Sequence, residues 1–459
     1  MTTTLPRPAA RVSRPTGPPG IATVAGLASR RLPSTEVFTR VAQEYPRVAH
    51  TRMFGEHVYF LTHPDTVREV YVTNGRFTIK GRALQRSKVL LGEGLLTSEG
   101  ELWKRQRRLV QPAFHAARIR TYAEQMVTTT LEHERDVWHD GRELDLVADL
   151  SALTLTVVGR TLFGADLSGD AGDVGAALTE ILTHFQRQVL PGAQLLERLP
   201  LPGVRRGMAA IAQLDDVVQR LVDEHRAAGD TGDVLSMLLS ARDDADGTGM
   251  DDRQVRDEVM TLVLAGHETT AMALSWTFAL LATNPAAAVA LHAELDDVLG
   301  GRAPTYDDLG RLPVTTATFA ESMRLYPPAW TLGRRLTADV VVDGWTLPAG
   351  SLVLASQWVL HRDPRFWPDA EEYLPQRWIN GDGRFDESAP GQPRTAWFPF
   401  GLGQRMCVGE PFAWAEGVLV LATLAQHWAP ELTDGRVPDV DPAVTLRPKG
   451  GLPAVLRRR

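Results

Sequence analysis

The sequence predicts a mainly α-helical protein with a small β region, and two features of its patterning support this. From about 100 to 300, apolar residues recur at helical spacing, and short proline- or glycine-containing stretches interrupt them. Strand-like runs occur near residue 50 and again over 339–356, but neither group is large enough to form a stable sheet alone. We therefore expect the early and late strands to pair, which makes 21–459 a single domain.

The expected elements follow one another along the chain, and turn signals separate them. The early strands precede a helix that begins at a Pro-Asp pair, and a good Asp-Gly hairpin turn lies between the late strands. An irregular, proline-rich stretch then leads to one last apolar helix. In order, these are strands over 48–54 and 57–62, a helix over 63–73, the turn at Asp343 and Gly344, the irregular stretch 362–399, and a helix from near Pro411 to about His427.

Composition excludes several classes of protein. The 459 residues are 44% hydrophobic and 23% charged, as in ordinary globular proteins, and a net charge of −7 gives no reason to expect a nucleic-acid partner. The single cysteine excludes intrachain disulfides, zinc ribbons and cysteine-ligated iron–sulfur clusters, so the cytoplasm is the simplest compartment. Residues 1–20 are proline-rich and predict a flexible arm, and the lack of an apolar run of about 18 residues predicts no membrane span.

The only cysteine, Cys407, lies in the glycine-rich stretch WFPFGLGQRMCVGE, just before the last helix. Gly403 and Gly409 permit a turn whose backbone N–H groups point at the sulfur, and the positive end of the helix after Pro411 faces the same atom. Such surroundings favour a thiolate, which is a soft metal ligand, and Arg405 is placed to bind a carboxylate on that ligand.

Other interpretations of this loop explain fewer of its features. A dinucleotide-binding glycine fingerprint fails because Met406 stands at the third glycine position. The local signatures of cysteine proteases are absent, although the sequence alone does not exclude a distant histidine partner. A buried, inert cysteine among fortuitous glycines is the remaining alternative.

A second unusual stretch, LVLAGHETTAMALSW over 262–276, is too apolar to face water and yet contains an acid. Its HE pair is not a zinc-protease motif, because Ala271 stands where the second histidine belongs. The carboxylate of Glu268, in the middle of this helix, is costly to bury unless it has a partner. Gly266 and the Thr269 hydroxyl, which can bond a carbonyl one turn back, predict a local bulge.

The order Phe400-x-x-Gly403-x-Arg405-x-Cys407-x-Gly409 resembles the haem-binding loop of the cytochrome P450 family, and the pattern is highly specific. The resemblance implies the P450 fold, with a long central helix over haem b, and makes Cys407 the axial thiolate ligand of the haem iron. It also implies that Arg405 pairs with a haem propionate and that Phe400 packs against the cysteine side of the ring.

The apolar helix also resembles its counterpart in this family. Glu268 and Thr269 match the acid–alcohol pair that relays protons for oxygen activation, and they are the expected catalytic residues. Ala265 and Gly266 match positions that line the pocket beside the haem.

Further matches concern the haem propionates. Trp103 and Arg107 share one helix face, and by resemblance they reach a propionate. Arg334 is expected to add another propionate contact, with Arg335 as the alternative.

One match is structural and not catalytic. The ESMR spacing places an acid and an arginine on one helix face, and in the family a later arginine completes an ion-pair trio that braces the cysteine loop. The three members here are Glu321, Arg324 and Arg377.

By this resemblance we expect a monomeric haem-thiolate monooxygenase that inserts one oxygen atom of O₂ into an apolar organic substrate. Hydroxylation or epoxidation of a terpenoid, fatty acyl or polyketide-like molecule fits a pocket lined by Leu264, Ala265 and residues 328–332. Residues 76–96 and 188–203 are the expected mobile walls of that pocket.

Electrons for this chemistry have to come from outside the chain, because no flavin-binding or ferredoxin-like segment is left over. A ferredoxin and its reductase are the expected donors, with docking near the basic helix 104–108. Two alternatives keep the haem, namely a peroxygenase driven by hydrogen peroxide and a non-enzymatic haem sensor or carrier. Neither needs an acid–alcohol pair, so Glu268 and Thr269 argue against both.

Overall fold

The computed structural model describes residues 14–20, 34–53, 55–165, 175, 177, 180–181, 201–229, 231–242 and 247–459. Of the predicted arm over 1–20, the first thirteen residues lie outside the described part of the chain, and so do 188–200 of the predicted pocket wall. Residues 14–20 are not a free arm, because the Thr16 carbonyl accepts a hydrogen bond from the His50 amide at 3.2 Å and the Pro18 carbonyl accepts one from the Thr51 hydroxyl at 2.8 Å.

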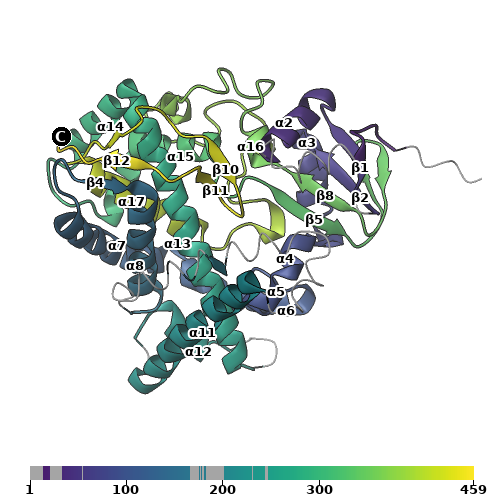
Figure 1. The fold of residues 1–459 in the computed structure, drawn as a ribbon, viewed down its shortest axis with the longest axis horizontal. Coiled ribbons are helices and arrows are strands. Elements are labelled where there is room, and N and C mark those ends of the chain that lie inside the picture. The colour runs from purple at the N-terminus through teal and green to yellow at the C-terminus, as the bar shows by residue number, and fades with distance from the viewer. Residues whose placement is uncertain are drawn as a thin grey trace, which may run out of the picture.

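Helices make up most of the described chain, as predicted (Figure 1). Short 3₁₀ and π turns connect several of them. The α-helices are α2 (Ser34–Glu44), α3 (Pro64–Arg68), α4 (Arg82–Arg86), α5 (Lys88–Leu91), α6 (Gly100–Val110), α7 (Ala116–Val137), α8 (Leu146–Leu162), α11 (Pro202–Ala228), α12 (Val234–Ser240), α13 (Asp252–Thr283), α14 (Pro285–Val298), α15 (Pro313–Leu325), α16 (Gln357–Leu360) and α17 (Glu410–Ala425).

The strands form one larger sheet and three small ones. The larger sheet has the order β1-β2-β8-β5-β3, and the smaller ones are β4-β12-β9, β6-β7 and β10-β11. The strands are β1 (Val48–Met53), β2 (Glu56–Leu61), β3 (Thr78–Lys80), β4 (Glu143–Asp145), β5 (Leu332–Leu336), β6 (Val340–Val342), β7 (Trp345–Leu347), β8 (Leu352–Ala355), β9 (Glu431–Leu432), β10 (Val440–Pro442), β11 (Leu446–Pro448) and β12 (Pro453–Val455).

The expected pairing of early and late strands is confirmed. β2 lies parallel to β8, with Val58 opposite Leu352, and β1 pairs with β2 as an antiparallel hairpin. The turn between β6 and β7 has a positive φ at both Asp343 (50°) and Gly344 (79°), as a two-residue hairpin turn of this kind needs. The strands after residue 430 have no counterpart in the sequence analysis, and part of the predicted mobile wall 76–96 belongs to the large sheet as β3.

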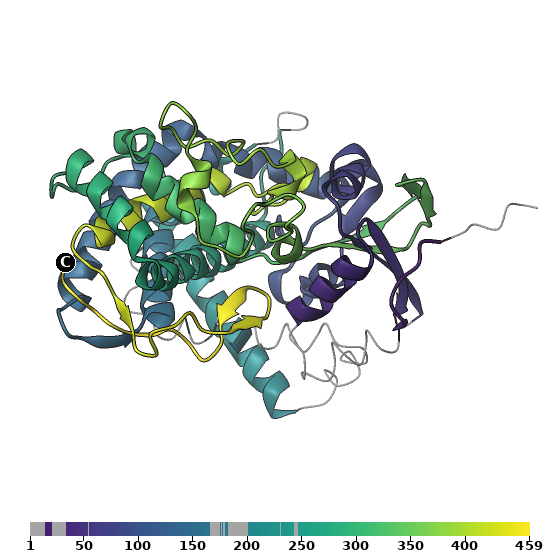
Figure 2. The same cartoon turned by 90° about the horizontal axis from the view of Figure 1, so that it is seen from above.

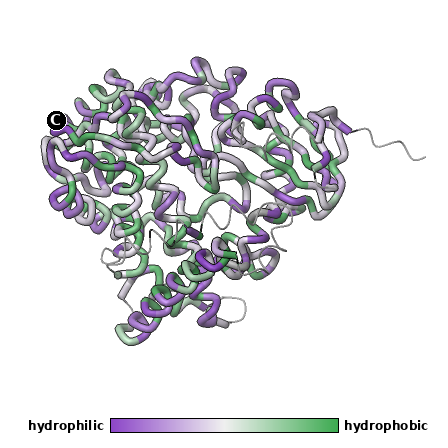
Figure 3. The backbone as a smooth tube through the Cα atoms, viewed as in Figure 1, coloured by the Kyte–Doolittle hydropathy of each residue, from purple (hydrophilic) through white to green (hydrophobic). Residues whose placement is uncertain are grey.

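Most of the long helices gather at one end of the molecule, and the five-stranded sheet lies at the other end together with α2, α3 and α16 (Figures 1 and 2). α13 runs through the middle of the molecule (Figure 1). The N-cap residue of α13 is Asp251, whose side chain accepts a hydrogen bond from the Gln254 amide, and the helix packs on α8, α11, α15 and α17. Hydrophilic residues are concentrated on the outer turns of the surrounding elements (Figure 3). α13 therefore forms the centre of the helical core, and any group on its surface is positioned by packing from several sides.

In the described part of the chain, no single helix is long and apolar enough to cross a membrane. α13 and α14 reach the length and composition of a span only when taken together, and they are bent by 110° at their junction.

Candidate active site

The cysteine loop is folded so that backbone N–H groups meet the sulfur, as predicted. The Cys407 amide donates to the Phe400 carbonyl at 2.9 Å, which closes the loop. α17 begins at Glu410, and the amides of Gly409 and Glu410 donate to the Cys407 sulfur. Desolvation by the surrounding protein raises the pKa of the thiol above its ordinary value, and these two donors oppose that rise. The donors thus act in the predicted direction, and a cation bound at the sulfur would favour the thiolate further.

The two glycines of the loop differ in what the backbone requires. Gly403 has a φ of +68°, and a Cβ there would lie 2.3 Å from the Tyr71 carbonyl oxygen, so only glycine fits. Gly409 has a φ of −85°, and a Cβ would make ordinary contacts with Phe114 and with the Cys407 sulfur at 3.7 and 3.9 Å. The backbone therefore requires glycine at position 403 but admits a side chain at position 409, where the amide donates to the sulfur as predicted.

Positively charged side chains gather beside this loop. The Arg405 guanidinium lies 4.2 Å from the centre of the Trp103 ring and forms a close ion pair with Glu99. Its Nη1 is buried without a hydrogen-bond partner among the described residues. Arg334 is buried on β5, opposite Lys80 on β3 in the strand register. We call Lys80, Arg334 and Arg405 the cation cluster, and Glu99 and Glu258 are the carboxylates whose charges act on its members.

The remaining basic candidates point elsewhere. Arg335 projects from the other face of β5 and pairs with Glu56 at 3.0 Å, so Arg334 is the arginine that joins the cation cluster. Arg107 donates from Nη1 to the Met406 carbonyl at 2.7 Å, which ties α6 to the residue before the cysteine. Trp103 and Arg107 thus both contact the loop region, but through different partners.

The Thr269 hydroxyl donates to the Ala265 carbonyl one turn back at 2.7 Å, as predicted. The predicted bulge is absent, because α13 continues without interruption from Asp252 to Thr283. Ala265 is exposed and Thr269 half-buried, although most neighbouring positions of α13 are buried. This places both on one accessible face of an otherwise buried helix. Gly266 is half-buried, and a Cβ there would press on Val158 at 3.1 Å.

Arg447, in β11, is the ion-pair partner of the buried Glu268 carboxylate. Nε and Nη2 of Arg447 lie 2.7 and 2.6 Å from Oε1 of Glu268, and the Thr445 hydroxyl donates to the same oxygen at 2.8 Å. Oε2 lies 3.9 Å from Nε2 of His267, and burial lowers the pKa of that imidazole to about 4. The structure therefore directs the Glu268 carboxylate to the C-terminal hairpin and not to the adjacent Thr269.

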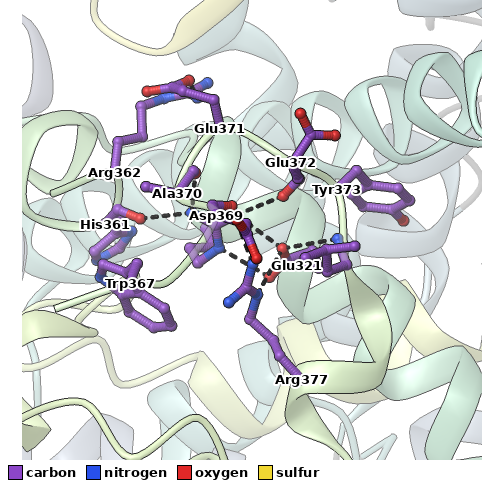
Figure 4. Close-up of polar contacts among 12 residues, drawn as sticks. Glu321, His361, Arg362, Trp367, Asp369, Ala370, Glu371, Glu372, Tyr373 and Arg377 are labelled. Carbon is purple, nitrogen blue, oxygen red and sulfur yellow. Dashed lines mark hydrogen bonds and ion pairs between the residues drawn. The ribbon is translucent and has the colours of Figure 1, made fainter. Parts of the chain in front are cut away.

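The predicted ion-pair trio is assembled and buried (Figure 4). Arg324 donates to both oxygens of Glu321 at 2.9 and 2.8 Å, and Arg377 donates to Oε1 at 3.0 Å. Arg324 also donates to the His361 carbonyl at 2.8 Å, and the His361 ring accepts from the Phe398 amide at 3.0 Å. This chain of contacts links the trio to the start of the cysteine loop, so His361, to which the sequence analysis gave no role, is part of the brace.

One of the residues expected to line the pocket lies elsewhere in the structure. Leu264 is half-buried on α13 next to Ala265. Trp330, in contrast, is 7% exposed, its indole donates to the Ala443 carbonyl, and its ring meets Phe38 edge-on. Trp330 therefore belongs to the core beneath the sheet and does not line a pocket.

A comparison with protein families decides the identity of the chain. The family model described as Cytochrome P450 matches residues 15–454. The chain belongs to the cytochrome P450 family. It is thus a haem-thiolate monooxygenase, and its cofactor is haem b.

Several bacterial P450 relatives match nearly the full chain. Cyclooctatin synthase of Streptomyces melanosporofaciens is 40% identical over 93% of this chain and 92% of the relative. Cyclooctat-9-en-7-ol 5-monooxygenase of the same organism is 37% identical over 83% and 82%. Pentalenene oxygenase of Streptomyces avermitilis is 34% identical over 89% and 90%.

The residues of this P450 fit a haem with two propionates. The cation cluster places three basic groups beside two carboxylates, Glu99 and Glu258, so positive charge is in excess in a largely buried place. The unpartnered Nη1 of Arg405 can donate to a propionate, and Cys407 is accessible at the positive end of α17. Lys80 was missed by the sequence analysis, because nothing in a three-residue strand distinguishes it from a surface lysine.

Proposed function

We propose that this P450 oxidises a low-polarity terpenoid, by hydroxylation or epoxidation of its carbon skeleton. Three relatives that cover more than four fifths of the chain have names that refer to cyclooctatin, cyclooctat-9-en-7-ol and pentalenene. Ala265 and Leu264 supply small apolar surface on the accessible face of α13, which suits a hydrocarbon substrate better than a charged one. The likeness to these relatives is the observation that favours a terpenoid over a fatty acyl or polyketide-like substrate.

The bound haem supplies oxygen activation, and the chain supplies the protons and the orientation. We assign proton handling to Glu268 and Thr269. Three donors hold Oε1 of Glu268, so Oε2 is the oxygen left to exchange a proton. The Thr269 hydroxyl, bonded to the Ala265 carbonyl, keeps its oxygen on the accessible face, where it can accept a hydrogen bond from a water molecule.

We further propose that a ferredoxin delivers the electrons near α6. The Arg107–Met406 contact places this basic helix against the cysteine loop. Lys104 is exposed on it, and its ion pair with Glu101 at 2.7 Å is a surface pair that contributes little stability. An acidic ferredoxin can therefore displace that contact. The single cysteine supports a cytoplasmic enzyme, where such donors are available.

The proposal is tested with the haem-loaded enzyme and a panel of cyclic terpenes, fatty acids and macrolactones. Substrate-induced changes in the haem spectrum identify the class that binds. Product formation is then measured with ¹⁸O₂, NADPH, a surrogate ferredoxin and its reductase, against hydrogen peroxide alone. We expect binding and ¹⁸O incorporation with terpenoids and the ferredoxin system. Equal turnover with peroxide alone would establish the peroxygenase, and binding without turnover would establish the sensor.

The ligand assignment has its own test. Cys407→Ser should remove the red-shifted absorption band that thiolate-bound ferrous haem shows with carbon monoxide, because the chain contains no other thiol. A retained band would contradict the assignment whatever the substrate is.

A further inference from the structure

Residues 92–98, which connect α5 to α6, are bonded to α13 through their backbone. The Glu93 amide donates to Asp257 at 2.8 Å, and the Leu95 amide donates to Oε2 of Glu258 at 2.9 Å. Both carboxylates are buried, Glu258 completely. We call residues 92–98 the connecting segment.

Two glycines allow this close approach. A Cβ at Gly92 would lie 2.1 Å from the Asp257 carboxylate, and one at Gly94 would lie 2.3 Å from the Thr261 hydroxyl. A side chain at either position would not fit between the connecting segment and α13. Polar contacts of the backbone to the helix therefore hold the segment in position.

Lys80 holds the same segment from the sheet side. Its Nζ donates to the Leu95 carbonyl and to the Ser98 carbonyl, each at 2.7 Å, and the side chain is buried. The backbone of Leu95 is thus held at its N–H by a buried acid, Glu258, and at its carbonyl by a buried base. Hydrogen bonds from a charged donor are roughly twice as strong as neutral ones, so the strength of the two Lys80 hydrogen bonds depends on the charge of the amine.

Lys80 is also a member of the cation cluster, and this makes its charge sensitive to what the cluster binds. Burial first, and Arg405 second, lower the pKa of the Lys80 amine to about 7. Arg334 lowers it further, while the carboxylates of Glu99 and Glu258 oppose this. Two negative charges placed beside Arg405 and Arg334 would remove the excess positive charge and favour the ammonium form.

We propose that Lys80 is a further residue of the haem propionate site, and that through it the charge of the cofactor fastens the connecting segment to α13. Part of this segment lies in the region 76–96 that the sequence analysis predicts as a pocket wall. Binding of the cofactor would thus be coupled, through one buried lysine, to how firmly the connecting segment is held against α13. The inference depends on haem binding but not on the terpenoid substrate or the ferredoxin donor.

The test compares the wild-type protein loaded with haem and with haem dimethyl ester, which keeps the iron and loses both propionate charges. Hydrogen exchange measured by mass spectrometry reports the amides of 93–98, and the ferrous carbon monoxide spectrum confirms that Cys407 ligates both forms. We expect these amides to exchange roughly tenfold faster with the ester, while the β10–β11 hairpin is unchanged. Equal exchange in the two forms would overturn the proposal, and this arm needs no variant.

A second arm uses Lys80→Met, which keeps the length of the side chain and removes its charge. Exposed Lys449→Met is the matched control. With natural haem, the amides of 93–98 should exchange as fast in Lys80→Met as in the wild type loaded with the ester. Loading Lys80→Met with the ester should add no further change. Lys449→Met should show the exchange of the wild type at 93–98. A Lys80→Met protein that is as protected as the wild type would show that the cofactor charge does not act through Lys80.

Discussion

Glu321 and Glu268 are both buried carboxylates on core helices, and both pair with arginine, but their hydrogen-bonding differs. Glu321 accepts on both oxygens, from Arg324, Arg377, the Leu374 amide and the Trp378 indole. Among the described residues, Glu268 accepts on Oε1, and the nearest charged partner of Oε2 is His267 at 3.9 Å.

The number of occupied oxygens distinguishes a structural carboxylate, Glu321, from a carboxylate with one oxygen left over, Glu268. A carboxylate with every lone-pair direction occupied has no site left for a proton, and breaking such a buried network leaves uncompensated charges. A carboxylate saturated on one side keeps its position and still has a free oxygen. The pattern of hydrogen bonds therefore fits Glu321 as part of the brace and is consistent with the proton handling that we propose for Glu268, although both sit in buried ion pairs.

The largest expected effect is on the brace. Glu321→Ala leaves Arg324 and Arg377 without their shared carboxylate in a buried site, which typically costs roughly 3–5 kcal/mol. Since domains are stable by only about 5–15 kcal/mol, we expect aggregation and poor haem incorporation. The soluble, haem-containing fraction after expression measures this. A well-folded, haem-replete but slow Glu321→Ala enzyme would mean that the trio is not a brace.

A third buried carboxylate, Glu416 on α17, extends the comparison because neither of its oxygens has a hydrogen-bond partner at normal distance among the described residues. Burial raises its pKa to about 8, and the nearby Thr270 hydroxyl only partly opposes this. The unfolded chain loses this proton near pH 4.5 while the folded chain retains it, so stability falls as pH rises from about 4.5 to 8.

Glu416→Gln removes this titration and should flatten that fall. At about 1.4 kcal/mol for each pH unit, the gain over the wild type reaches at most about 5 kcal/mol at pH 9 and vanishes near pH 4.5. Urea unfolding followed by haem absorbance at several pH values measures it. A gain that is the same at pH 5 and pH 9 would show that Glu416 is not protonated in the folded protein.

The Glu268–Arg447 pair is expected to contribute less than the brace, because Arg447 is partly exposed. Arg447→Met leaves Glu268 buried without its cation and should cost about 2 kcal/mol. Glu268→Gln in the same chain should recover part of this loss, since no uncompensated charge then remains. A double-mutant cycle in urea measures the coupling. Additive effects would show that the two side chains do not interact energetically.

Thr269→Ala should have the smallest effect on stability and a selective effect on chemistry. The Thr269 hydroxyl bonds only its own helix at Ala265, so the ion pairs and Cys407 are untouched and substrate binding should survive. We expect continued electron consumption with less product and more hydrogen peroxide, because protons are no longer delivered in a controlled way. Product, peroxide and reductant consumed are measured in one assay. Unchanged product per electron would remove Thr269 from proton handling.

Much of this molecule was predictable from local sequence. The helix 410–425, the Asp343-Gly344 turn, the cysteine loop and the Glu321–Arg324 pair are each specified within about fifteen neighbouring residues, through periodicity, turn chemistry or i,i+3 spacing. The pairing of β2 with β8 was also predictable, since neither strand group can form a stable sheet alone.

Only the tertiary structure decided which charges meet. The sequence determined that Glu268 needs a partner if it is buried, but Arg447 lies 179 residues away on a hairpin too short to give a strand signal. Likewise, Lys80 and Arg334 become neighbours only because β3 joins β5 in the large sheet. Local patterns report backbone conformation and burial, whereas the partner of a buried charge depends on long-range packing, which no single stretch of sequence contains.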